Sequence, residues 1–173
     1  MSGTLREIER IQRSMLRASP QVLFVFGDNL HRVGLGGQAK EMRGEPNAIG
    51  IPTKKAPSMR ESAFFTDADF QDVKPYIDAS FSRIEQHLQS GGTVAWPKAG
   101  IGTGLSQLPQ RAPRIAAYIL TRIERLKSIV AGTSRENPVD WNTVFALRRL
   151  AQGSPETAAS ETDIQEQRSA ARK

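Results

Sequence analysis

Two glycine-rich segments of the sequence are suited to binding phosphate. The first, GLGG at 34–37, comes after a short apolar run at 22–26, and the second, GIGTG at 100–104, comes after an apolar run at 93–97. Each apolar run predicts a strand that leads into a glycine-rich loop. Such loops expose backbone N–H groups, which bind phosphate oxygens without a charged side chain. Two of them in one small protein predict a ligand with two phosphates, held from both sides.

Each glycine segment also has a purely structural interpretation. The segment at 34–37 is typical of a tight turn, and Asn29 upstream could either bond sugar hydroxyls through its amide or simply tolerate a left-handed backbone. The spacing does not match the G-x-G-x-x-G or G-x-x-x-x-G-K-[ST] patterns, which argues against a redox dinucleotide site and a P-loop ATPase. The segment at 100–104 is the stronger signal, because Ile101 and Leu105 indicate a shaped, partly buried loop.

A pair of lysines follows a third apolar run. Lys54 and Lys55 come directly after residues 48–52, at the predicted end of a strand. A lysine at this place could neutralise phosphate, or act as a nucleophile if burial or a nearby cation lowers its pKa. It could also be an ordinary surface lysine, and the residues alone leave these three roles open.

Composition excludes several kinds of site. The chain has 173 residues and no cysteine, which rules out disulfides, zinc–thiolate sites and cysteine nucleophiles. The two histidines, His31 and His87, are far apart and do not have metal-ligand spacing, so we expect no metal site. We also expect no cofactor. No signal-peptide core or run of about 20 apolar residues is present, and we therefore expect a cytoplasmic protein without a membrane partner. The net charge of +6 favours nucleic acid or another polyanion as partner, or serves only solubility.

The order of predicted elements indicates an α/β fold. Apolar runs predict strands at 22–26, 48–52 and 93–97, and helical spacing predicts helices at 4–17, 36–43, 69–89 and 110–127. This alternation predicts a mostly parallel sheet with helices on both faces. Ligands of such sheets bind beyond the carboxyl ends of the strands, where both glycine segments begin.

The chain divides into four predicted parts. Residues 1–20 would hold an N-terminal helix, with a T-x-x-E capping box, that packs on or flanks the domain. The ligand-binding domain would span 21–130, a further helix would lie in 131–151, and the polar residues 152–173 would form a disordered tail.

Three segments together resemble the macro domain family, which binds ADP-ribose. They are FGDN with GLGGQA at 26–39, IPTKK at 51–55 and WPKAGIGTGL at 96–105, within a region of about 22–127. The likeness is greatest to the branch with the terminal ADP-ribose protein glycohydrolase and the antitoxin macro domains paired with DNA ADP-ribosylating toxins. The resemblance implies a macro-like three-layer fold. It also implies that Asn29 contacts the distal ribose and that the glycines of the two loops bind the diphosphate.

The resemblance also implies a chemistry and a departure from it. In this branch a lysine after threonine attacks the anomeric carbon of ADP-ribose, and its counterpart here is Lys54, which follows Thr53. In the protein glycohydrolase an aspartate follows the Gly-Leu of the second loop, whereas this sequence has Ser106. A hydroxyl cannot serve as a carboxylate base near neutral pH, and Asp28 is the candidate substitute. The family's adenine-reading aspartate has no counterpart that we can assign.

The leading prediction is therefore a domain that binds ADP-ribose or ADP-ribosylated macromolecules, and whose candidate reaction is hydrolysis of ADP-ribose from nucleic acid or protein. The first alternative is a non-catalytic sensor or sequestering protein for an ADP-ribose-derived nucleotide, and the second is a basic nucleic-acid-binding module. Lys54 is the candidate catalytic residue, and Asp28, Thr53 and Ser106 are secondary candidates. The predicted ligand-binding residues are Asn29, Gly34, Gly36, Gly37, Lys54, Gly100, Ile101, Gly102, Thr103 and Gly104.

Overall fold

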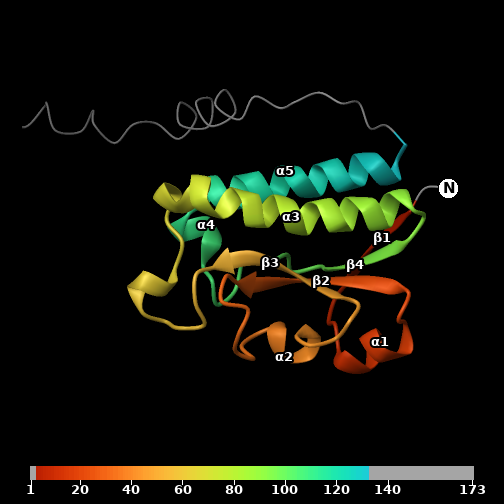
Figure 1. Cartoon of the computed structure of the whole chain (residues 1–173), viewed down its shortest axis with the longest axis horizontal. Helices are drawn as coiled ribbons and strands as arrows, with labels where there is room; N and C mark the ends of the chain where they lie inside the picture. Colours follow the sequence, from red (N-terminus) through yellow and green to blue (C-terminus); the bar gives the residue numbers. More distant parts are fainter. Residues whose placement is uncertain (1–2, 133–173) are drawn as a thin grey trace, which may run out of the picture. The chain divides into compact units, whose positions relative to one another are not determined.

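A parallel sheet of four strands forms the middle layer of the protein (Figure 1). The computed structural model describes residues 3–132, and they fall within one compact unit, Met1–Arg135. The strands lie in the order β1-β4-β2-β3 and pair in parallel, so their carboxyl ends meet at one edge. Their bounds are β1 Thr4–Ile8, β2 Val22–Asn29, β3 Ala48–Lys54 and β4 Thr93–Pro97.

Helices cover both faces of this sheet, which confirms the predicted three-layer α/β fold. The long helices α3 and α5 lie side by side above the sheet in Figure 1, and the short helices α1 and α2 lie below it. Two 3-10 helices, η1 and η2, lead into α3. The bounds are α1 Arg13–Ala18, α2 Ala39–Met42, η1 Glu61–Ala63, η2 Asp67–Asp69, α3 Phe70–Gln89, α4 Leu108–Arg111 and α5 Pro113–Val130.

Strand β2 contributes to the core on both sides. Phe24 and Phe26 pack with Leu16 of α1 and Met42 of α2 in one apolar cluster. The intervening residue Val25 is also fully buried. Because alternate side chains of a strand point to opposite faces, a strand buried on both faces needs an uninterrupted apolar run, as residues 22–26 provide.

The long helix α3 presents the apolar stripe that its sequence predicts. Ile77, Phe81 and Ile84 recur at helical spacing and are fully buried. The ring of Phe81 lies 6.3 Å from that of Trp96 on β4, measured between centroids. This stripe therefore attaches α3 to the sheet.

The predicted helix at 4–17 is wrong in its first half. Residues Thr4–Ile8 form strand β1, which pairs with β4 from Thr4↔Thr93 to Ile8↔Pro97, and only Arg13–Ala18 is helical. Within residues 3–20, the predicted N-terminal helix is thus a strand followed by a short helix. The backbone groups of β1 bond to a strand far along the chain, and this tertiary ladder overrides the local capping signal.

The remaining predicted elements are close to those observed. The helix predicted at 110–127 is divided into α4 and α5 next to Pro113, because the residue before a proline disfavours helical geometry. The predicted helix at 131–151 lies outside the described residues except for residues 131 and 132, which form a turn, and the predicted tail at 152–173 lies wholly outside them. Among the described helices, none has the length and apolar character that a membrane span requires.

Candidate functional site

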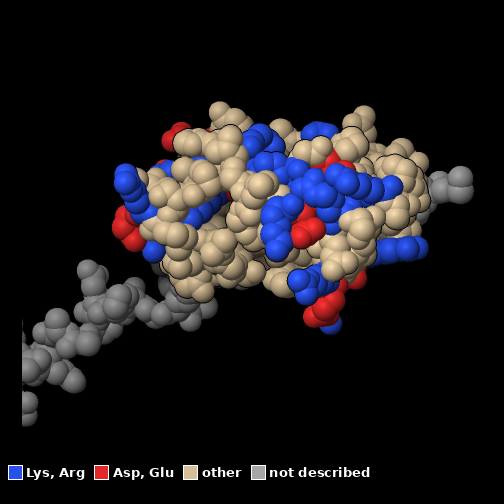
Figure 2. All heavy atoms as spheres, turned by 90° about the horizontal axis from the view of Figure 1, so that it is seen from below, with Lys and Arg blue, Asp and Glu red and all other residues tan. Residues whose placement is uncertain are grey.

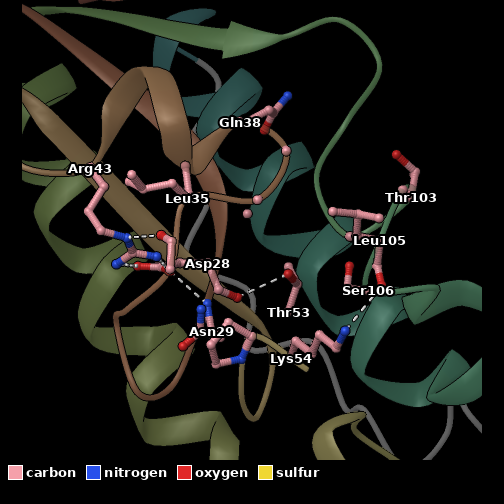
Figure 3. Close-up of a pocket in the computed structure, with 18 of the residues that line it drawn as sticks. Asp28, Asn29, Leu35, Gln38, Arg43, Thr53, Lys54, Thr103, Leu105 and Ser106 are labelled. Carbon is pink, nitrogen blue, oxygen red and sulfur yellow. Dashed lines mark hydrogen bonds and ion pairs between the residues drawn. The ribbon is translucent and has the colours of Figure 1, made fainter. Parts of the chain in front are cut away.

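A cavity of about 470 Å³ opens where β2, β3 and β4 end (Figure 3). Its wall is built from the end of β2, the loop before α2, the end of β3 and the loop after β4. These are the segments that the sequence placed at the carboxyl edge of the sheet. The parallel pairing of the strands brings them together, although more than 60 residues separate the two glycine loops.

The two glycine loops contact each other across this cavity. Leu105 of the second loop lies against the first, since its Cδ1 is 3.4 Å from where a Cβ on Gly36 would stand. Gly102 has φ of 78°, and a Cβ there would approach Leu108 to 3.0 Å. The second loop is therefore a packed structure in which glycine is required, rather than a flexible connector.

All but one of the predicted site residues line this cavity. The exception is Ile101, which is buried and does not face the cavity. The lining residues that the sequence predicted are Asn29, Gly34, Gly36, Gly37, Lys54, Gly100, Gly102, Thr103 and Gly104, with Asp28, Thr53 and Ser106 among the secondary candidates.

Lys54 is buried in the cavity wall, with only 7% of its surface exposed. Its Nζ donates to the carbonyl oxygen of Leu105 at 3.4 Å and lies 3.4 Å from Sδ of Met59 (Figure 3). Within the described residues, no carboxylate forms an ion pair with it. Burial lowers the pKa of Lys54, and the charge of Arg111 lowers it further. This environment favours the neutral amine, which is the nucleophilic form.

An aromatic ring lies between Lys54 and a second cation. Nζ of Lys54 is 4.0 Å from the ring centroid of Phe64, and Cζ of Arg111 is 3.8 Å from the same centroid. Arg111 also pairs with Glu61, at 2.5 Å. This group could not be predicted from the sequence, because its members come from the segment before α3 and from α4, which carry no recognisable motif.

The Asp28 carboxylate is directed to Arg43 rather than to Lys54. Asp28 and Arg43 form an ion pair, and the carboxylate also accepts the backbone N–H of Asn29 at 2.7 Å (Figure 3). Nε of Arg43 donates to the carbonyl oxygen of Gly34 at 2.8 Å. The pair therefore anchors the first glycine loop to the end of β2, and Asp28 is not placed as a partner of Lys54.

Asn29 is only partly satisfied by the protein. Its Nδ2 donates to the carbonyl oxygen of Val33 at 2.8 Å, which stabilises the turn after β2. Its Oδ1 is buried and has no hydrogen-bond partner among the described residues. An unpaired acceptor in a cavity wall costs free energy, and a hydroxyl donor on a ligand would relieve this cost.

Exposed apolar side chains line the cavity as well. Val33, Leu35, Met59 and Leu105 are each at least half exposed. Apolar side chains gathered around a cavity are typical of a ligand site with rings or other apolar parts. The sequence gives no reason to single them out, since scattered apolar residues in loops are common.

Comparison with known proteins assigns the chain to a family. A family of unknown function, DUF7831, matches residues 6–122. The chain belongs to this family. The region that matches DUF7831 includes every residue that lines the cavity. No curated protein matches the chain, and no solved structure does. In the described part of this DUF7831 member, no group of three or more His, Asp or Glu side chains is placed to hold a metal ion.

Proposed function

We propose that this protein binds ADP-ribose or an ADP-ribosyl group in the cavity at the carboxyl edge of the sheet. The observation that carries the proposal is the buried, carboxylate-free Lys54 between two glycine loops that contact each other. The resemblance to macro domains supports the choice of ligand. The cavity volume of about 470 Å³ also suits it, since small-molecule sites span roughly 300–1,000 Å³.

The parts of the ligand match the parts of the site. The backbone of the two glycine loops would bind the diphosphate, as glycine-rich loops after strands do. The side-chain amide of Asn29, which lines the cavity, would hydrogen-bond a ribose hydroxyl. The exposed apolar side chains, Leu35 and Leu105 among them, would contact the ring systems of the ligand.

Hydrolysis of a bond to ADP-ribose would proceed through Lys54. The lone pair of its neutral amine forms a bond to the anomeric carbon, while the bond to the acceptor atom breaks and the acceptor leaves with the electron pair. The nitrogen passes a proton to the leaving acceptor. Water then replaces the nitrogen on that carbon, which restores the amine and releases ADP-ribose. This sequence needs no carboxylate at Ser106, because the amine itself supplies the proton.

Calorimetry and a substitution test the two parts of the proposal. Calorimetric titration with ADP-ribose should show saturable binding, and absence of heat at millimolar ligand would overturn the proposal. Lys54→Ala should abolish release of ADP-ribose from an ADP-ribosylated substrate and leave the fold intact. Lys55→Ala is the matched control, since Lys55 is the next residue but pairs with Asp69 at 2.9 Å. Equal turnover by Lys54→Ala and wild type would remove Lys54 from the reaction.

A non-catalytic sensor is the second candidate, and Ser106 favours it. In the sequence, Ser106 stands where the resembled protein glycohydrolase has its aspartate, and its side chain is buried in the cavity wall. Mass spectrometry of an ADP-ribosylated substrate after incubation separates the candidates. Release of ADP-ribose supports the hydrolase, and an unchanged substrate that still binds supports the sensor.

Nucleic acid is a third candidate partner. Lys and Arg side chains gather on the face that carries α1 and α2 (Figure 2). Arg17 and Lys40 on this face are more than 60% exposed. Binding to single- or double-stranded DNA should weaken steeply as salt increases if this face contacts phosphates. Affinity that does not depend on salt would contradict this candidate.

A further inference from the structure

Two positive side chains share one buried aromatic ring beside the cavity. The Phe64 ring is 2% exposed, with Lys54 Nζ at 4.0 Å and Arg111 Cζ at 3.8 Å from its centroid. Both distances lie in the range of cation–π contacts. A single ring that serves two cations in a poorly solvated place stabilises each less than it would stabilise one alone.

Arg111 is held firmly in this arrangement. Its guanidinium bonds to both carboxylate oxygens of Glu61, at 2.5 and 3.1 Å, and its Nε donates to Oε1 of Gln107 at 2.8 Å. Arginine also stays protonated at every pH that a folded protein tolerates. Of the two cations at the Phe64 ring, Lys54 is therefore the one that can lose its charge.

The other charged groups around Lys54 already have partners. Lys55, the residue after the end of β3, pairs with Asp69, and Asp28 at the end of β2 pairs with Arg43. The charged side chain of α4 is Arg111 itself. The charged side chain of η1 is Glu61, which forms an ion pair with Arg111. The pocket wall around Nζ is completed by the thioether of Met59 and by a backbone carbonyl, neither of which carries a charge.

We propose that Arg111 is a positioning residue, whose fixed positive charge on the other cation contact of the Phe64 ring disfavours a proton on the Lys54 amine. Its part in a reaction rests on the proposed function, whereas its effect on the amine does not. The lowered pKa of Lys54, caused first by burial and then by Arg111, agrees with this geometry. The charge of Arg111 thus increases the fraction of Lys54 that is in the neutral, nucleophilic form, as a neighbouring cation does for other nucleophilic lysines.

The pH dependence of Lys54 labelling tests this role without any ligand. The full chain is treated briefly with acetic anhydride over a range of pH, and acetylation of Lys54 is measured by peptide mass spectrometry. Arg111→Gln should move the midpoint of Lys54 labelling to higher pH, because it removes the positive charge. Arg111→Met, which keeps an extended apolar side chain over Phe64, should do the same and serves if the glutamine variant does not fold. Arg17→Gln, a remote control, should leave the midpoint unchanged.

A midpoint that stays at the wild-type value in a folded Arg111 variant would overturn the inference. So would equal shifts in the Arg111 variants and in Arg17→Gln, because the effect would then come from net charge. A failure of ADP-ribose to bind would overturn the proposed function and leave the labelling result valid. If turnover is found, Arg111→Gln should lower kcat at neutral pH and recover it at higher pH, with KM little changed. A loss of kcat that is independent of pH would indicate a merely structural role.

Discussion

The ion pair between Asp28 and Arg43 should be the most sensitive polar contact around the cavity. The side chains are 3% and 18% exposed, so the pair is shielded from water. In Arg43→Gln, the Asp28 carboxylate keeps the backbone N–H of Asn29 but loses its countercharge. Removing one member of a buried pair costs about 3–5 kcal/mol. Total stabilities are about 5–15 kcal/mol, so this loss would be a large fraction of the whole.

Urea unfolding followed by circular dichroism measures this cost. The matched control is Arg17→Gln, which removes an arginine from the same layer. Arg17 is 67% exposed and shares Glu45 with Arg13, so its loss should cost at most about 1 kcal/mol. The double variant Asp28→Asn with Arg43→Gln removes both charges and should be more stable than Arg43→Gln alone.

Two results would refute this reasoning. One is an Arg43→Gln variant whose free energy of unfolding lies within about 1 kcal/mol of the wild-type value, because a loss that small is typical of an exposed ion pair. The other is a double variant whose cost equals the sum of the single costs, since that would mean the two side chains do not interact. Arg43 also holds the first glycine loop through Gly34, so weaker ADP-ribose binding should accompany the loss of stability.

Three further predictions concern other parts of the structure. Gly102→Ala should destabilise the folded protein by about 1–2 kcal/mol, because φ of residue 102 is 78° and the new Cβ would meet Leu108. Gly104→Ala is the control. It should leave the melting temperature unchanged, because a Cβ at Gly104 meets nothing within 4 Å. Asn47→Ala should cost about 1–3 kcal/mol in urea unfolding, because the two N–H groups of Asn47 Nδ2 are shared among three carbonyl oxygens that each lie 3.0 Å away. Lys54→Met should stabilise the fold at a pH below the lowered folded pKa, where wild type holds a buried charge. This gain should shrink as pH rises through the folded pKa and vanish above 10.5, where Lys54 is uncharged in both the folded and the unfolded state. A gain that is constant with pH would contradict the last of these.

The central strands of the sheet could be predicted from the sequence, because burial on both faces requires a continuous run of apolar residues. The run at 22–26 is apolar without interruption, and that pattern alone implies a strand covered on both faces. Strand β1 has no such apolar run. Only Leu5 and Ile8 of its five residues are even partly buried, and their spacing of three also fits a helix. Its pairing with β4 decides its structure, and a local pattern cannot report that pairing.

The same distinction applies to the site. Glycine loops and the Thr53–Lys54 strand end could be predicted, because both follow apolar strands whose ends must converge. The environment of Lys54 could not. Phe64 and Arg111 reach it from segments that the sequence marks only as a loop and as part of a helix, and their contact exists only after folding. The interpretation of Asp28 as a candidate base stayed open for the same reason, since its direction depends on Arg43.

The pairing of β1 with β4 has a consequence for how the chain folds during synthesis. The partner of β1 lies far along the chain, at 93–97, so it is made well after β1. Strands β2 and β3 are closer in sequence and can pair earlier, at a smaller entropic cost of loop closure. Until β4 emerges, β1 is an unpaired strand and one edge of β2 is open. The nascent chain should therefore be most vulnerable to aggregation and proteolysis until residues 93–97 have been made. A chain truncated before Thr93 would lack β4, the strand that lies between β1 and β2.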